Sequence, residues 1–197
     1  MQNHNELKRL AITIEGSLLL LSVLLAWTFR LPLLENLRWN GWDIALGIGF
    51  SLPMFVLLFF IVHNSMGPLR GLKEVFDTVL IPLLQPYSTW DFAWMSLLAG
   101  VAEELLFRGV LQIGLGRVLS PGMGVLLAGI LFGLAHCITI FYAVIAGAIG
   151  IYLGLIFMYS NNLLTVITAH AVYDFIALIY LVKFCESKPI DGEFVRK

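Results

Sequence analysis

The sequence predicts an all-α, polytopic membrane protein: a bundle of about six transmembrane helices with an added amphipathic helix at the membrane interface. Of its 197 residues, 59% are hydrophobic and only 13% are charged, whereas a soluble domain carries about a quarter charged residues. Several apolar runs approach the twenty or so residues that cross a bilayer as a helix. No basic run is dense enough for nucleic-acid binding, so we expect no nucleic-acid partner.

Six apolar segments are long enough to span a membrane. We expect the spans at residues 10–29, 42–62, 89–117, 122–138, 141–159 and 162–183. Helices are the only form that fits, because such runs lack the alternation of a barrel strand. Lys8 and Arg9 precede the first run as in a signal peptide, but no small-residue cleavage pattern follows, so we expect a retained first span. Without repeats or a flexible linker, residues 1–197 are expected to form a single membrane domain.

The segment from Leu69 to Gln85 has a different pattern. Its apolar residues recur at helical spacing with polar residues between them. This pattern predicts a helix that lies in the plane of the interface. Two roles remain open for it, a helix packed on the bundle and a lateral gate for substrate.

The Lys and Arg residues predict the orientation, because cytoplasmic loops carry the excess of them. With the N-terminus inside, eight lie on the cytoplasmic side and three on the other: Lys8, Arg9, Arg70, Lys73, Lys183, Lys188, Arg196 and Lys197 against Arg30, Arg38 and Arg117. We therefore expect both termini in the cytoplasm. We expect the membrane itself to be a bacterial inner (plasma) membrane. The sequence predicts no oligomeric state.

Charged residues interrupt the third span, in the run AGVAEELLFRGVLQ. Ionisable residues at bilayer depth are costly and mark function by default. Glu104 and Arg108 are four apart on one helix face, which suits an ion pair that positions the site. Glu103 points about 100° away from that face, which leaves its carboxylate free for chemistry. The alternative is one packing network without catalysis.

Two histidines lie inside the fourth and sixth expected spans. Phe132 and His136 are four apart, so the aromatic ring can wall one side of the imidazole, and His170 and Asp174 have the same spacing. Alone, each pair suits a structural role. At about 1.5 Å per residue, however, Glu103, His136 and the His170 pair overlap in depth within the hydrocarbon. Three helices can therefore bring a carboxylate and two imidazoles together.

Three short motifs resemble those of a known family. EELLFR at 103–108, FGLAH at 132–136 and HAVYD at 170–174 are similar to the EExxxR, FxxxH and HxxxN/D motifs of the CAAX prenyl protease 2 type, also called the CPBP or Abi family. The resemblance covers roughly residues 90–180. It implies an intramembrane endopeptidase that acts on a membrane-anchored protein or peptide, by CAAX-type, bacteriocin-leader or C-terminal sorting-tail processing.

The resemblance also implies roles for single residues. Glu103 corresponds to the base that activates water, with His136 helping to orient it, and His170 and Asp174 correspond to the oxyanion stabilisers. Glu104 and Arg108 occupy supporting positions. Asp174 departs from the asparagine form, since an ionised Asp repels an oxyanion. It must then be protonated or act by orienting His170.

Other readings of the same residues remain open. Glu103, His136 and His170 would suit Zn²⁺, but HExxH is absent, and a metal-free mechanism in which Glu103 takes the proton of water is favoured. A non-catalytic immunity or assembly protein could use the same buried polar network. A proton-coupled transporter could use it as a relay, although the chain is short and has no internal repeat.

Overall fold

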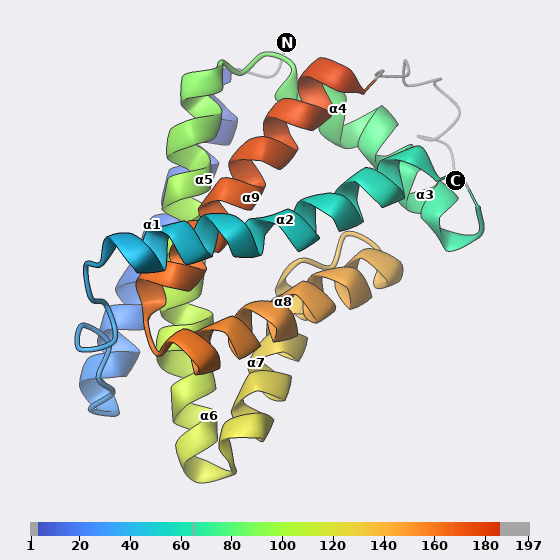
Figure 1. The fold of residues 1–197 in the computed structure, drawn as a ribbon. Helices are drawn as coiled ribbons and strands as arrows, with labels where there is room; N and C mark the ends of the chain where they lie inside the picture. Colours follow the sequence, from blue (N-terminus) through green and yellow to red (C-terminus); the bar gives the residue numbers. More distant parts are fainter. Residues whose placement is uncertain (1–3, 65, 186–197) are drawn as a thin grey trace.

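The computed structural model describes residues 4–64 and 66–185. All regular structure in these residues is helical, which confirms the predicted all-α class. The segments are α1 (His4–Thr28), α2 (Gly41–His63), α3 (Pro68–Val75), η1 (Phe76–Leu80), α4 (Ile81–Leu84), α5 (Thr89–Glu104), η2 (Leu105–Gln112), α6 (Ile113–Val118), α7 (Pro121–Ala135), α8 (Ile140–Ser160) and α9 (Leu163–Phe184). The η segments are π-helical turns that continue the helices around them, so α3–η1–α4 and α5–η2–α6 each form one rod (Figure 1).

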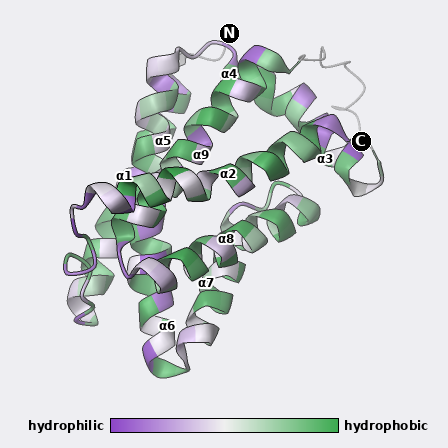
Figure 2. Ribbon diagram, in the orientation of Figure 1, coloured by the Kyte–Doolittle hydropathy of each residue, from purple (hydrophilic) through white to green (hydrophobic). Residues whose placement is uncertain are grey.

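Four helices of the described residues are long and apolar enough to cross a bilayer: Glu6–Thr28 of α1, then α2, α8 and α9. The chain is therefore an integral membrane protein. Figure 2 shows apolar residues along these helices, and bulky ones such as Leu20 and Val56 face outward, where lipid would cover them. The rod α5–η2–α6 carries charges, and α7 is about 22 Å long against about 30 Å of hydrocarbon. The count of six spans stays a prediction.

Two predicted spans differ from the observed helices in detail. The span expected at 89–117 is a continuous rod to Val118, but its middle is the wider π-helical η2. The span expected at 122–138 ends earlier, at Ala135, so His136 is the residue that caps the helix rather than part of it. The chain turns after His136 and enters the next helix. Thr139 caps the start of α8, because its side chain accepts a hydrogen bond from the backbone N–H of Tyr142.

The amphipathic segment expected from Leu69 to Gln85 is helical as α3–η1–α4. Its apolar side, including Leu72, Phe76 and Ile81, is buried against α2, α8 and α9. Arg70 and Glu74 lie on the exposed side. The amphipathic pattern is thus explained by packing on the bundle, while a gating role stays a prediction.

Helices α7 and α8 pack closely through glycines. A Cβ added at Gly129 would lie 2.8 Å from the backbone nitrogen of Ile151, and one added at Gly150 would lie 3.0 Å from the Cα of Gly129. These contacts leave no room for side chains, so the GxxxG spacing at 129/133 and 150/154 serves close helix packing. The same approach brings the α8 backbone within reach of side chains on η2.

The first helix is tied to the start of α5. Lys8 Nζ lies 2.6 Å from Asp91 Oδ1, and Asp91 also forms a capping box with Ser88 at the start of α5. Further along, α1 packs against η2. Helix α1 and the rod α5–η2–α6 therefore run side by side in the same direction. Of the basic residues that predict the orientation, Lys188, Arg196 and Lys197 lie outside the described residues.

Candidate active site

Three elements supply the polar residues of the site. Glu103 and Glu104 end α5, His136 caps α7, and His170 lies in α9 with Asp174 one turn further on. Burial excludes water from most of them: Glu104 is fully buried, His170 is 4% exposed and Glu103 is 9% exposed. The structure places His136 beside Glu103 and His170 beside Glu104, while a shared catalytic role for these residues stays a prediction.

Glu103 and His136 face each other across the site. Oε2 of Glu103 lies 3.6 Å from Nε2 of His136, and it is buried without a hydrogen-bond partner among the described residues. Nδ1 of His136 lies 2.9 Å from the carbonyl oxygen of Phe132. Because a carbonyl only accepts, Nδ1 carries a proton, and Nε2 is the ring nitrogen that points toward Glu103. One water molecule about 2.8 Å from each group could hydrogen-bond to both.

Glu104 belongs to a separate network that uses one of its two oxygens, since its Oε2 and the Nε of Arg108 are buried without a hydrogen-bond partner among the described residues. Its Oε1 accepts hydrogen bonds from Nη1 of Arg108 and from Nδ1 of His170, each at 2.7 Å. The predicted ion pair of Glu104 with Arg108 is thus present, and the direct bond to His170 is an addition that spacing did not reveal. The two adjacent glutamates have different partners: Glu104 binds Arg108 and His170, whereas Glu103 lies beside His136.

Arg108 is the central structural cation of the site. It is fully buried, and Nη2 donates to the carbonyl oxygen of Gly150 at 2.8 Å. One turn further, Gln112 donates to the carbonyl oxygen of Gly154 at 3.0 Å. These two bonds join η2 to α8. The widened π-helical turns are common at functional sites, and here they present both side chains to the same neighbouring helix.

His170 is held between two carboxylates. Besides Glu104 at Nδ1, its Nε2 lies 3.4 Å from Oδ2 of Asp174. Two carboxylates facing the two ring nitrogens suit an imidazolium, which donates from both. Asp174 was expected either to be protonated or to orient His170. The contact with Nε2 is the one that orienting His170 would need. Asp174 is 28% exposed along its side chain, so it is also open to the cavity.

Phe132 packs at the centre of these residues. Its ring stacks on His136 with centroids 4.3 Å apart and meets the ring of His170 edge-on at 5.8 Å. Cζ of Arg108 lies 4.7 Å from its centroid, close enough for a cation–π contact. The predicted aromatic wall beside His136 is therefore present, and the same ring also contacts the second histidine and the arginine.

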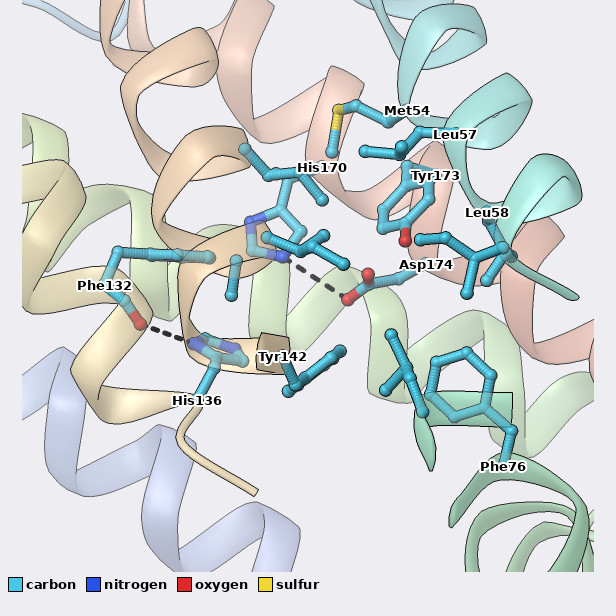
Figure 3. Close-up of a pocket in the computed structure, with 15 residues that line it drawn as sticks. Met54, Leu57, Leu58, Phe76, Phe132, His136, Tyr142, His170, Tyr173 and Asp174 are labelled. Atoms are coloured by element: carbon cyan, nitrogen blue, oxygen red, sulfur yellow. Dashed lines mark hydrogen bonds and ion pairs between the residues drawn. The ribbon is translucent and has the colours of Figure 1, made fainter. Parts of the chain in front are cut away.

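A cavity of about 60 Å³ opens beside the two histidines (Figure 3). Its polar end is formed by His136, His170 and Asp174, and the apolar remainder comes from α2, α3, η1 and α8, with Leu58, Phe76 and Ile145 among the lining residues. A water needs about 15 Å³ of such space, so several fit.

Sequence reasoning missed three residues at the site. The rings of Tyr142 and Tyr173 line the cavity beside Asp174 (Figure 3). Glu15 of α1 interacts electrostatically with Glu103, both site histidines and Asp174. A signal for Glu15 was present, because a lone carboxylate inside an apolar span is itself unusual. Aromatic residues in apolar spans carry no such signal.

The contacts do not form a zinc site. Both ring nitrogens of His170 face carboxylates, and Glu104 is occupied by Arg108 and His170. Within residues 4–64 and 66–185, no three metal-binding side chains converge. The donor set that would be needed, Glu103, His136 and His170, is therefore not presented to one ion.

Comparison with known families supports the resemblance of the motifs. Residues 85–176 match the family model described as type II CAAX prenyl endopeptidase Rce1-like. This range begins just before α5 and ends in α9, so it contains all seven predicted site residues. The comparisons with curated proteins and with solved structures each returned no match.

Proposed function

We propose that this chain, whose residues 85–176 are an Rce1-like CAAX endopeptidase domain, is an intramembrane endopeptidase that activates water with Glu103. One observation carries the proposal: the Oε2 atom of Glu103 is buried, unbonded and 3.6 Å from Nε2 of His136. A desolvated carboxylate held beside an imidazole is a general base that needs a proton donor, and a water molecule that bridges the two groups from one side can be that donor.

Hydrolysis then follows from the positions of the side chains. Glu103 removes a proton from the water that His136 orients, and the hydroxide attacks the scissile carbonyl. The developing oxyanion is stabilised by the imidazolium of His170, whose Nε2–H exchanges its 3.4 Å contact with Asp174 for a hydrogen bond to the oxyanion. Protonated Glu103 passes its proton to the leaving amine, which restores the site. Glu104, Arg108 and Phe132 hold the histidines in place.

The substrate we propose is a membrane-anchored protein or peptide. An apolar cavity wall and a site on helices of an integral membrane protein favour a chain that arrives within the bilayer. Processing of a prenylated tail, a bacteriocin leader or a C-terminal sorting tail would all present such a chain. We also propose that both termini of the chain lie in the cytoplasm.

The test uses purified protein in lipid vesicles and a set of membrane-anchored reporter peptides. Glu103→Gln should lower cleavage at least about 10³-fold, because the amide cannot accept the proton of water. Glu35→Gln, on the exposed α1–α2 loop, is the matched control and should retain full activity. Full activity of folded Glu103→Gln protein would refute the mechanism, and peptide binding without cleavage by the wild type would favour a non-catalytic role.

A further inference from the structure

Glu15 is a carboxylate in the middle of a membrane-spanning helix and has no protein partner at one oxygen. Its Oε2 is buried and accepts no hydrogen bond from the described residues. The helix around it is apolar and largely exposed. Lipid offers no hydrogen bonds, so a carboxylate retained there needs a reason that packing does not supply.

Packing of α1 places Glu15 on the inward face at the level of the site. Lys8 anchors the helix to Asp91 of α5, and Leu18 packs against the cluster that contains Phe107 and Phe132. Glu15 lies between these two contacts, and Ala11, Leu18 and Ser22 on the same helical face are also at least half-buried. Its carboxylate is thus turned toward α5 rather than toward lipid.

Most of the charged groups near Glu15 that are not already in an ion pair are negative. The titratable groups whose charges act on it are Glu103 of α5, His136 after α7, and His170 and Asp174 of α9. The cations nearest the site, Arg108 of η2 and His170, already bond Glu104. On α1 itself, Lys8 is paired with Asp91. Glu15 and Glu103 therefore remain as two carboxylates without a cation of their own.

We propose that Glu15 is a positioning residue whose buried carboxylate, on the face of α1 that packs against α5 and η2, acts on Glu103 by its charge and sets the pH range in which Glu103 can act as base. Two carboxylates in one low-dielectric site hold a shared proton rather than two full charges. When Glu15 carries that proton, Glu103 is ionised and can accept one from water. The inference rests on the proposed function and assigns it a residue outside the matched range 85–176.

The first test is the pH dependence of peptide cleavage. Glu15→Gln removes the competing negative charge, so the acid-side midpoint of kcat/KM should fall by about one pH unit while activity at neutral pH is kept. Glu15→Asp retains the charge and should keep the midpoint near that of the wild type. Glu6→Gln makes the same change on an exposed part of α1 and serves as the matched control.

The second test needs no activity and so separates this inference from the proposed function. Infrared spectra of the protein in lipid nanodiscs follow carboxyl protonation against pH, and Glu103→Gln identifies the band of Glu103. In Glu15→Gln that band should titrate at lower pH than in the wild type. An unchanged titration, loss of activity at every pH, or failure of Glu15→Gln to fold would each overturn the proposal, because Glu15 is assigned no structural bond.

Discussion

His170 donates from Nδ1 to Oε1 of Glu104 at 2.7 Å, on the oxygen that also accepts from Arg108. The helix that carries the proposed base therefore also fixes the second histidine. Glu103 and Glu104 are neighbours in sequence, so a small rotation of α5 would move the base and the anchor of His170 together. The geometry of both halves of the site depends on this one rod.

Glu104→Ala should destabilise the fold strongly. It leaves the fully buried Arg108 and His170 without their shared acceptor, and breaking a buried ion pair from one side costs about 3–5 kcal/mol. Unfolding in detergent measures the loss. Glu74→Ala, on the exposed side of α3, should change stability little. Wild-type stability of Glu104→Ala would show that Arg108 finds another partner.

His136→Asn should abolish cleavage without unfolding the protein, since the side chain is partly exposed and its ring is the group proposed to orient the water. His63 is a close control: its Nδ1 also lies 2.9 Å from the carbonyl oxygen four residues earlier, and its ring stacks on Phe59 at 4.2 Å. It faces Tyr180 rather than a carboxylate. The His63→Asn variant should therefore cleave the peptide normally. An equal loss of cleavage activity in both variants would contradict a specific role for His136.

Asp174→Asn should keep activity within about tenfold of the wild type. The amide oxygen can still accept from Nε2 of His170, 3.4 Å away in the wild type, while the amide nitrogen can donate to the oxyanion. Asp174→Leu offers neither group and should lose about 10²-fold or more in kcat. Steady-state kinetics distinguish the two. If Asp174→Asn is as inactive as Asp174→Leu, the negative charge itself is required.

Gly129→Ala should destabilise the α7–α8 pair by about 1–3 kcal/mol. The added Cβ would lie 2.8 Å from backbone nitrogen of Ile151, which cannot move without shifting α8. Gly49→Ala is the control, because nothing lies within 4 Å of its added Cβ and alanine favours a helix by about 1 kcal/mol. In detergent, the unfolding temperature should fall in Gly129→Ala and rise in Gly49→Ala. Similar shifts would mean that the glycines are not packing contacts.

The orientation can be read from cysteine labelling. Both native cysteines, Cys137 and Cys185, are free and lie at ends of helices that the Lys and Arg distribution places on the cytoplasmic side. A membrane-impermeant maleimide should label them in inverted vesicles and not in right-side-out cells. Glu35→Cys, in a variant without the native cysteines, should show the reverse pattern. Labelling of Glu35→Cys from the cytoplasmic side would invert the topology.

Much of the site was predictable because its residues are chemically out of place in apolar spans. Glu103, Glu104, Arg108, His136, His170 and Asp174 were all found in this way, and the i, i+4 spacing predicted the ion pair and the stacked Phe132–His136 rings. The same rule applied to the first span would have found Glu15. Spacing could not predict the bond from His170 to Glu104, because the two residues are 66 apart in sequence.

The sequence by itself determined the membrane class, the helical form and the local pairs, since apolar length and helical periodicity act within one segment. Only the tertiary structure decided which partners meet. Phe59–His63 and Phe132–His136 have the same motif and nearly the same local geometry, yet only the second pair faces a buried carboxylate. The reason is packing: the glycine contacts of α7 with α8 and the bonds from η2 to α8 bring His136 to Glu103, and nothing within the motif encodes that position.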